Sequence, residues 1–477
     1  MNFSKRNQKT IFIFYIVISV ALRFFSFFPS VMDHDESTYL IIGRDILNGK
    51  DLYEDVTDTK PVGIFLFYAA LEFLFGSSIF LKRLFFSLIV GITGFLVFKV
   101  SLKLFSERKT AFASGVIYIL YVSIWNLHGL SPNTELLFNF FTICGLFLFL
   151  HSGLWNYFAG GLLMGAGFMV KYVVLFDFAA FMFFFFLKEI ANPENRGKTA
   201  EWGKYLMAGA AFAIPFLLTN LWFWISDHFS DFVFVTYELP SNYGGSPSLK
   251  RYVVMLVDFT AKFLPISFLV FYVVLKKEKS FMQNQGWFFM VWVCFVLFAM
   301  YIMGKEFSHY TIQLMLPFSL VAGLFFHPGF NSGAVPEKLY SGKTGAILLT
   351  SILLTVQING IYNEIIKPDY EREVAAYLSE RMDPGDQIYV SNYHQIVYYL
   401  LKIDSPTKFI HSNLLFTDTH KSFNINAEQE IKRILGNSPR FVIIKDQNTR
   451  MKNLISGKYT ELKDFDKNKI QIYELKH

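Results

Sequence analysis

The residues best suited to chemistry form an acidic cluster near the N-terminus. Asp33, Asp35 and Glu36 place three carboxylates within four residues, with His34 among them, directly after an apolar run. Carboxylates crowded beside a low-dielectric boundary raise at least one pKa or require a cation, and both are settings of a general base or a metal site. A structural role is the alternative, since Asp33 or Asp35 could cap the amphipathic stretch 37–47.

A second acid and several basic side chains follow near the ends of apolar runs. Glu135 begins such a run, where an acid either caps the helix or faces the interior of a helix bundle. Lys171 joins two runs, and it either snorkels to the membrane edge or holds an anionic ligand. Further basic side chains are Lys60, Arg83 and His309. Together these groups suit a reaction in which an acid activates a hydroxyl while cations stabilise a leaving phosphate.

Apolar helices must position these groups. The chain is 53% hydrophobic and 17% charged, which is too apolar for a soluble protein of its length. Its net charge of +6 comes without a basic block and gives no indication of a nucleic-acid partner. Cys144 and Cys294 lie in apolar runs and are expected to be free thiols. The apolar runs interpreted as membrane spans are 10–29, 81–105, 110–130, 134–151, 155–170, 172–187, 205–225, 257–275, 286–303, 310–326 and 344–362.

The distribution of Lys and Arg sets the predicted orientation. The stretch 61–80 is also apolar, but if it spanned, most basic loops would face away from the basic N-terminus. The positive-inside rule therefore favours 61–80 as a juxtamembrane helix along the outer surface. This leaves about eleven transmembrane helices with the N-terminus cytoplasmic. The acidic cluster then lies in an outer loop over 30–80, and a second outer loop covers 226–256.

The first run, 10–29, is interpreted as a retained helix, because Arg23 and the phenylalanines after it make a poor signal-peptide cleavage site. The loop 226–256 could act as a lid over the site with Gly244-Gly245 as its hinge, or be a plain interfacial segment.

After residue 362 the sequence becomes soluble in character and is expected to form a small α/β domain over 363–477, outside the cytoplasm. This domain either covers the site and helps to hold the acceptor, or stabilises the fold as a cap. Helices are predicted over 369–382, 395–401 and 427–435, and strands over 387–391, 408–411, 441–445 and 470–475.

An outward-facing site limits the choice of donor. Nucleotide-activated donors are cytoplasmic, and no Gly-rich loop of the kind that cradles phosphates stands out in the sequence. The activated group would then arrive on a membrane lipid, and a polyprenyl-phosphate sugar is the obvious candidate.

Motifs ordered along the chain resemble the GT-C glycosyltransferases, of the type that includes protein O-mannosyltransferases and the aminoarabinose transferase acting on lipid A. Each motif alone is weak, whereas their order and spacing are specific for the family. They are Asp35-Glu36 with Tyr39, Gly49-Lys50-Asp51-Leu52-Tyr53, Lys60-Pro61, Phe75-Gly76 with Arg83, Pro132-Asn133-Thr134-Glu135, Gly165-Ala166-Gly167 with Lys171, and His309-Tyr310 ahead of Pro317.

The resemblance implies an inverting transfer of a sugar from a polyprenyl phosphate to an acceptor glycan, lipid or protein. It places the Asp35-Glu36 pair at the reaction centre, with Asp35 as general base or acceptor-orienting carboxylate, and Glu135 completing the acidic centre. By the same resemblance Lys60 binds the donor phosphate. Weaker matches to phosphate or head-group contacts are Arg83, Lys171 and His309.

This chain also departs from the family pattern. Val62-Gly63 stands where relatives often have a second proline, and Asp33-His34 adds an acid and an imidazole. In some relatives a divalent ion bridges carboxylates equivalent to Asp35 and Glu135. Asp33, Asp35 and Glu135 are therefore candidate metal ligands, but the spacing contains no local metal signature and the metal stays unassigned.

The sequence thus predicts a GT-C-like catalytic membrane domain over 1–362 and a periplasmic domain over 363–477, in a multi-pass protein of a bacterial inner membrane. A transporter or flippase of lipid-linked sugars is the competing function, since buried charge also marks translocation paths. A non-catalytic lipid-binding scaffold is a third. Transporters place such charge near the bilayer midplane, whereas the polar residues here gather at one predicted face.

Overall fold

The computed structural model describes residues 5–125, 128–191, 202–243, 248–276, 285–304, 307–327, 358, 361–362, 366–445, 449–465 and 467–476. The contacts between residues divide the chain into two compact units. The helical unit comprises Met1–Phe27, Arg83–Thr219 and Gly245–Ile366, and the mixed unit comprises Phe28–Lys82, Asn220–Gly244 and Lys367–His477.

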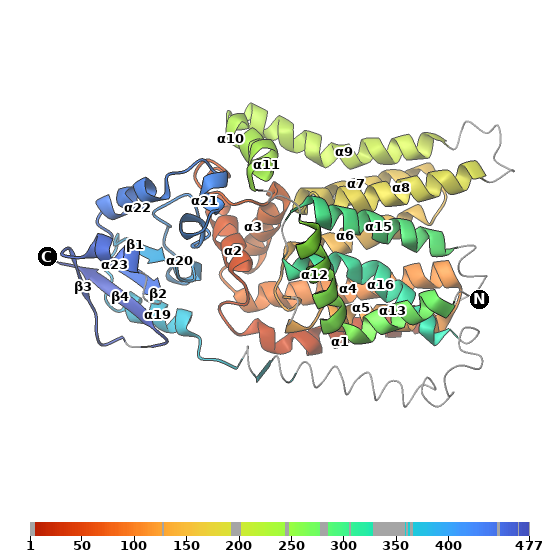
Figure 1. Ribbon diagram of the computed structural model, residues 1–477, viewed down its shortest axis with the longest axis horizontal. Coiled ribbons are helices and arrows are strands. Elements are labelled where there is room, and N and C mark those ends of the chain that lie inside the picture. The colour runs from red at the N-terminus through yellow and green to blue at the C-terminus, as the bar shows by residue number, and fades with distance from the viewer. Residues whose placement is uncertain are drawn as a thin grey trace. The chain divides into compact units, whose positions relative to one another are not determined.

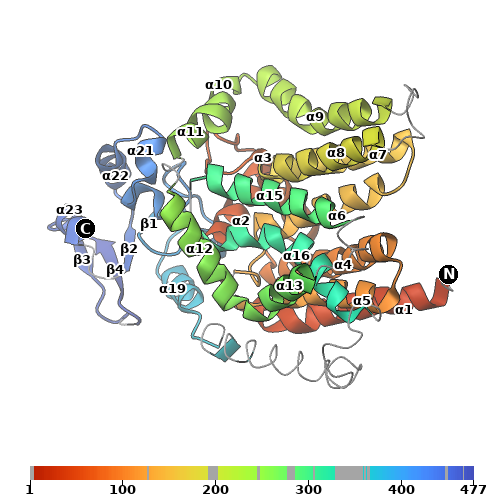
Figure 2. The ribbon, with the colours of Figure 1, turned by 45° about the vertical axis from the view of Figure 1, so that its right-hand side comes forward.

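The helical unit is built from apolar helices. Figures 1 and 2 both show α7 and α8 side by side, with α15 alongside α8. Two of its helices continue into the mixed unit, since α4 begins there and α9 ends there. The elements are α1 (Lys5–Arg23), η1 (Phe24–Phe27), α4 (Ile79–Phe105), α5 (Arg108–Tyr121), α6 (Thr134–Phe149), α7 (Leu154–Val170), α8 (Val174–Ala191), α9 (Trp202–Ile225), α12 (Leu249–Lys262), α13 (Leu264–Lys276), α15 (Trp287–Ile302), η7 (Ser308–Leu314), α16 (Met315–Gly323) and η8 (Leu324–Phe326).

Several of these helices are suited to a bilayer, and the chain is a multi-pass membrane protein. Among the described residues, four segments are long and apolar enough to cross a membrane: Gln8–Phe27, Ile79–Phe105, Trp202–Ile225 and His309–Phe326. Shorter apolar helices are Val62–Phe75, Thr134–Phe149, Leu154–Val170 and Trp287–Ile302. The count of about eleven spans stays a prediction. The run predicted over 344–362 lies almost wholly outside the described residues.

The prediction of one continuous helix over 257–275 is wrong. α12 and α13 meet at Phe263 with a bend of 99° (Figure 2). Pro265 stands at the second position of α13. In a continuous helix its missing N–H would leave the Ala261 carbonyl without a donor, and its ring would clash with that carbonyl. The chain therefore starts a new helix instead of continuing the first.

The mixed unit joins the first predicted outer loop, part of the second, and the C-terminal segment. Its helices are α2 (His34–Leu47), α3 (Val62–Phe75), α10 (Phe229–Val233), the π-helix η5 (Phe234–Glu238), α11 (Leu239–Tyr243), α19 (Tyr370–Ser379), α20 (Ile396–Leu401), η10 (Leu414–Phe416), α21 (Thr419–Ser422), α22 (Ala427–Gly436) and α23 (Thr449–Ile455). Its strands are β1 (Ile388–Ser391), β2 (Phe441–Lys445), β3 (Tyr459–Glu461) and β4 (Ile470–Leu475).

The four strands form one mixed sheet in the order β1-β2-β4-β3 (Figure 1). β1 and β2 pair in parallel, with Ile388 opposite Phe441, while β4 runs antiparallel to both β2 and β3. The residues of β2 from Phe441 to Ile444 are all fully buried, as expected for an unbroken apolar strand covered on both faces. The small α/β domain predicted at the C-terminal end is confirmed.

α2 and α3 pack tightly because of one glycine. A Cβ atom on Gly43 would lie 2.7 Å from the backbone carbon of Tyr68, so a larger residue would push the helices apart. α3 has 14 residues, about 21 Å at 1.5 Å per residue, which is short for a bilayer span. Its predicted position along the membrane surface stays a prediction.

Within the C-terminal segment, the strand predicted over 408–411 is wrong. This stretch makes only an isolated parallel bridge, in which Phe409 pairs with Thr57 of the first loop and Lys408 O accepts from Thr57 N at 2.8 Å. β3 and α23 are further elements that the sequence pattern did not predict. One break between the two units, at residues 366 and 367, lies near the predicted domain boundary, but residues 28–82 and 220–244 group with the C-terminal segment.

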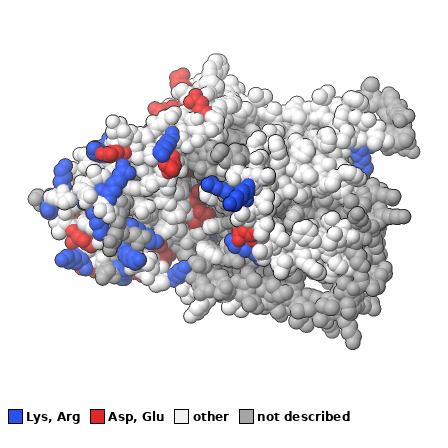
Figure 3. Space-filling model, in the orientation of Figure 1, with Lys and Arg blue, Asp and Glu red and all other residues white. Residues whose placement is uncertain are grey.

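The surface differs between the elements of the two units. Figure 3 shows Lys, Arg, Asp and Glu side chains gathered over the C-terminal domain, whereas the visible face of the described apolar helices carries few.

Both cysteines are free, as predicted, with Cys294 exposed on its apolar helix.

Candidate active site

Asp33 and Asp35 have different roles at the start of α2. Asp33 is the N-cap residue, and its Oδ1 accepts the backbone N–H of Asp35 at 3.0 Å. The capping role considered for the acidic cluster is therefore filled by Asp33. Asp35 lies in the first turn, and its side chain makes different contacts.

Asp35 is paired with Lys60, the side chain predicted to bind the donor phosphate. Lys60 Nζ lies 3.2 Å from Asp35 Oδ1 and 3.2 Å from Asp58 Oδ2. The side chains of Asp35 and Lys60 are 21% and 20% exposed, so each is largely enclosed but still reachable. Tyr53 donates its hydroxyl to the Lys60 carbonyl at 3.0 Å and so fixes the backbone of the lysine.

Three histidines lie beside this pair in the mixed unit. The ring of His34 stacks on those of His394 and His411, with centroid distances of 4.2 and 5.6 Å. Burial and the neighbouring His411 lower the pKa of His34, while burial and His34 lower the pKa of His394 to about 3. His411 Nε2 lies 3.8 Å from Asp35 Oδ1. Sequence reasoning missed His394 and His411, because nothing local connects either with the acidic cluster.

Glu36, predicted as the partner of Asp35, is buried, with only 2% of its surface exposed. Its charge acts on Lys82 and Tyr399, which belong to a separate polar network of the mixed unit. There Lys82 Nζ donates to Glu72 Oε2 and to Tyr399 Oη, both at 2.6 Å. Neighbouring positions on a helix face different directions, which separates the contacts of Glu36 from those of Asp35.

The helical unit holds a second carboxylate–ammonium cluster around Glu135. Glu135 lies in the first turn of α6, and its Oε1 forms an ion pair with Lys171 Nζ. His309 Nε2 lies 3.9 Å from the same oxygen, and Lys171 Nζ lies 3.9 Å from the centre of the Tyr310 ring. The structure thus brings together Glu135, Lys171 and His309, three of the predicted site residues. Arg83 is buried elsewhere in this unit and donates to Ser26 O at 2.7 Å.

Buried hydrogen bonds position η7, the short helix that carries His309. Asn139 donates to Ile312 O at 3.1 Å. Asp177 of α8 accepts from Gln313 Nε2 and from Trp292 Nε1, both at 2.6 Å. Sequence reasoning missed Asp177, although a lone acid within a Phe-rich apolar run is itself a signal, because burying a carboxylate in such a run requires polar partners.

No metal is assigned to the predicted ligands Asp33, Asp35 and Glu135. Within the described residues, no group of three or more His, Cys, Asp or Glu side chains is arranged to hold a metal ion. The Asp33 oxygen is engaged instead in capping α2. The predicted hinge Gly244-Gly245 lies outside the described residues.

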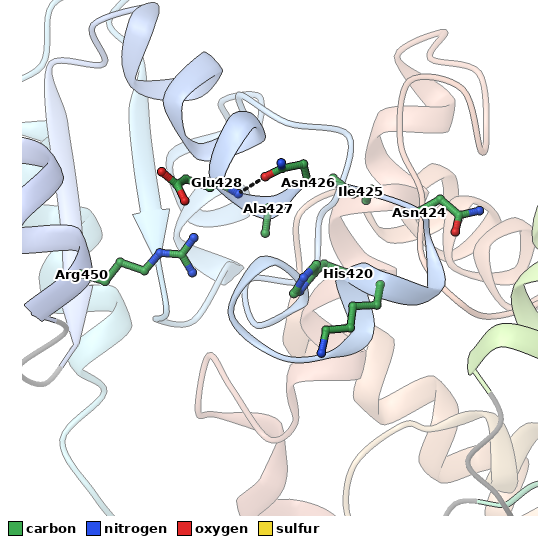
Figure 4. Close-up of a pocket in the computed structure, with 8 residues that line it drawn as sticks. His420, Asn424, Ile425, Asn426, Ala427, Glu428 and Arg450 are labelled. Atoms are coloured by element: carbon green, nitrogen blue, oxygen red, sulfur yellow. Dashed lines mark hydrogen bonds between the residues drawn. The ribbon is translucent and has the colours of Figure 1, made fainter.

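A hollow of about 500 Å³ lies on the C-terminal domain at the start of α22 (Figure 4). Asn426 Oδ1 caps this helix by accepting the N–H of Glu428 at 3.1 Å, the bond drawn in the figure. The charges that line the hollow are of both signs and mostly paired, Lys421 with Asp418 and Glu428 with Lys432. The hollow therefore offers a solvated polar surface rather than a reactive cluster.

Comparisons with known proteins bear on the fold. No family model matches the chain, and no curated protein matches it. The solved structures that match include ArnT from Cupriavidus metallidurans bound to undecaprenyl phosphate (TM-score 0.61) and the same protein in the apo state (TM-score 0.62). Each is 12% identical to this chain, and the matches cover 97% of both chains. At this identity the likeness shows the fold alone: the chain has an ArnT-like fold, and the expected helical membrane protein with a small α/β domain is confirmed.

Proposed function

We propose that this chain is an inverting glycosyltransferase. It moves a sugar, a hexose or a pentose, from a polyprenyl-phosphate donor to an acceptor glycan, lipid or protein. The reaction takes place at the outer face of a bacterial cytoplasmic membrane, with the N-terminus in the cytoplasm and the C-terminal domain in the periplasm. Residues 1–362 form the catalytic membrane domain, and 363–477 the periplasmic domain.

The Asp35–Lys60 pair is the observation that carries this proposal. A carboxylate held 3.2 Å from an ammonium, each about one-fifth exposed, can accept a proton from a hydroxyl while the cation attracts a phosphate. The pair belongs to two motifs whose order along the chain resembles the GT-C family. The shared fold with ArnT, one structure of which is bound to undecaprenyl phosphate, supports a lipid-phosphate donor.

The transfer balances as a single displacement. The acceptor oxygen attacks the anomeric carbon of the sugar, and a new carbon–oxygen bond forms while the bond from that carbon to the phosphate oxygen breaks. The bonding electron pair leaves with the polyprenyl phosphate, whose added negative charge Lys60 stabilises. The proton of the acceptor hydroxyl passes to the Asp35 carboxylate. Attack from the side opposite to the leaving group inverts the anomeric centre.

The Glu135 cluster supplies further anion-binding capacity in this proposal. Lys171 lies between the Glu135 carboxylate and the Tyr310 ring, and His309 is a third group at the same acid. The catalytic roles of Glu36 and Glu135 and the phosphate-binding role of Arg83 remain sequence-based expectations, since these side chains are buried.

A lipid-linked-sugar transporter or a non-catalytic scaffold remains the competing function. Either could use the buried ion pair of Glu135 and Lys171, since paired charges within membrane helices also line translocation paths. Neither needs a proton acceptor such as Asp35, with a lysine at hydrogen-bond distance, in a unit that also contains an α/β domain. Asp35 therefore discriminates between these functions.

The test is a transfer assay in membranes with a panel of radiolabelled polyprenyl-phosphate sugars. The wild-type chain is compared with Asp35→Asn and with the control Asp418→Asn, which changes an exposed aspartate of the C-terminal domain. We expect label to move from the lipid to a new acceptor with the wild type and the control, and not with Asp35→Asn. Label that crosses the bilayer still attached to its lipid would support the transporter, and equal transfer by Asp35→Asn would overturn the assignment of Asp35.

A further inference from the structure

We propose that His411 of the C-terminal domain is a positioning residue of the Asp35 centre, so that this domain completes the reactive site instead of only capping the fold. The proposal rests on the proposed function, because it gives His411 a role through Asp35. It adds a residue from a region with no recognisable catalytic motif.

The backbone places His411 opposite the Asp35–Lys60 pair. Thr57 and Phe409 form a parallel bridge, and Thr57 N donates to Lys408 O at 2.8 Å. Lys60 follows three residues after the first bridge partner, and His411 follows two residues after the second. One backbone contact between the first loop and the C-terminal domain thus places the side chains of Lys60 and His411 beside Asp35.

The hydrogen bonds of His411 determine which ring nitrogen faces the carboxylate. His411 Nδ1 accepts the backbone N–H of Asn413 at 3.4 Å. In the neutral ring the proton is therefore on Nε2, the nitrogen that lies 3.8 Å from Asp35 Oδ1. This distance is longer than a hydrogen bond, but such contacts are often loose without substrate and tighten in the reacting complex.

Neighbouring side chains hold the segment around His411 in place. Gln395 accepts from Ser412 Oγ at 3.0 Å, and its amide nitrogen donates to His34 O and to Thr38 Oγ1, both at 2.8 Å. The His34 ring also stacks on the His411 ring. The C-terminal domain and the start of α2 are therefore joined on both sides of Asp35, which limits the freedom of its carboxylate.

Two donors on the carboxylate are useful for the reaction. Lys60 and His411 both approach Oδ1 of Asp35 and so hold the orientation of the carboxylate that receives the proton of the acceptor. Holding a base in a productive orientation accounts for a large part of the rate, and small displacements are costly. Loss of His411 should therefore lower kcat and leave donor binding, which is assigned to Lys60, nearly unchanged.

Two substitutions separate this role from a structural one. His411→Phe keeps an aromatic ring to stack on His34 but removes the N–H, whereas His411→Gln loses the ring but keeps a donor at a similar reach. We expect His411→Phe to lower kcat by about ten- to a hundredfold with little change in KM for the donor. His411→Gln should retain the larger part of the activity. Matched controls are His420→Phe and His420→Gln, at the surface hollow of the same domain, and these should behave as wild type.

The relative transfer rates of His411→Phe and His411→Gln decide between a positioning role and a packing role. If His411→Phe transfers as fast as its His420 control, or faster than His411→Gln, the ring matters as packing and the proposal is wrong. Failure of the proposed function would look different, because the wild type itself would then transfer no sugar or Asp35→Asn would be fully active. Thermal unfolding of each purified variant identifies a loss of activity that arises from misfolding.

Discussion

The two carboxylate–lysine pairs of this protein differ in their surroundings. Asp35 and Lys60 are each about one-fifth exposed and meet a histidine from the C-terminal domain. Glu135 and Lys171 are 1% and 10% exposed among apolar helices, where an aromatic ring covers the lysine. A pair open to solvent can exchange protons with a substrate, whereas a buried pair must keep its charges matched. The same two functional groups are therefore suited to chemistry in one unit and to organising charge in the other.

Substitution of Asp35 gives the most direct test of the difference between the two pairs. Asp35→Asn should lower sugar transfer by about a hundred- to ten-thousandfold, because it removes the proton acceptor. Its effect on the free energy of unfolding should stay below about 1 kcal/mol, since a partly exposed ion pair contributes little. Transfer kinetics and thermal unfolding of the same preparation measure both quantities. A variant that keeps its activity but loses stability would make Asp35 structural.

The buried pair should show the opposite behaviour. Glu135→Gln leaves the Lys171 ammonium buried without its counter-charge and should cost about 3–5 kcal/mol of stability. Combining it with Lys171→Met should restore much of that loss, because no unmatched charge remains. Unfolding in detergent measures the effect. The control is Glu428→Gln in the exposed pair Glu428–Lys432, which should change the stability little. If Glu135→Gln is no more destabilising than this control, the pair is not a structural unit.

Substitution of Asp177 tests whether the helical unit depends on a further buried carboxylate. Asp177→Leu leaves the Trp292 indole N–H and the Gln313 amide without their acceptor, which should cost about 1–3 kcal/mol for such a buried donor. Asp177→Asn, which keeps an acceptor oxygen, should cost less. Because Gln313 belongs to η7, the helix that carries His309 should also shift. Unfolding of both variants in detergent measures the loss of stability. Equal stability of the Leu and Asn variants would contradict this role.

The effect expected to be smallest near neutral pH is a pH dependence of stability in the mixed unit. The pKa of His394 is lowered to about 3 and that of His34 is also lowered, both mainly by burial, so the unfolded chain binds protons at these sites before the folded chain does. The contribution of these two histidines to the free energy of unfolding is therefore complete above about pH 6.5. It decreases as the pH falls toward 3, by at most about 1.4 kcal/mol per pH unit for each proton. His394→Phe should flatten this dependence. An unchanged slope in that variant would assign the effect to other groups.

Much of the helical unit follows from local sequence. Long apolar runs bounded by charge predict helices because only an α-helix satisfies its own backbone in an apolar environment. In the same way, an aspartate just before an amphipathic stretch predicts a cap, and Asp33 provides it. The alternating apolar pattern of the C-terminal segment predicted its α/β character, since period and turn residues are local properties.

Other features depended on tertiary packing. Phe409 and Ile410 suggest a strand over 408–411, yet only Phe409 pairs, with Thr57 of the first loop at a single bridge. The contact between Asp35 and His411 joins positions far apart in the chain, and no periodicity encodes which distant segments meet. Burial of Glu36 beside Lys82 and Tyr399, next to a partly exposed Asp35, was equally beyond local reasoning.

The sequence by itself thus determined the apolar helices, the small α/β domain and the residue types available for catalysis, because hydrophobic periodicity and capping act between neighbours along the chain. Tertiary structure alone decided that Asp35 has Lys60 and His411 as partners, that Lys171 is matched by Glu135, and that Asp177 supports η7. Those choices depend on which side chains share a low-dielectric environment, and this is fixed only when distant segments pack together.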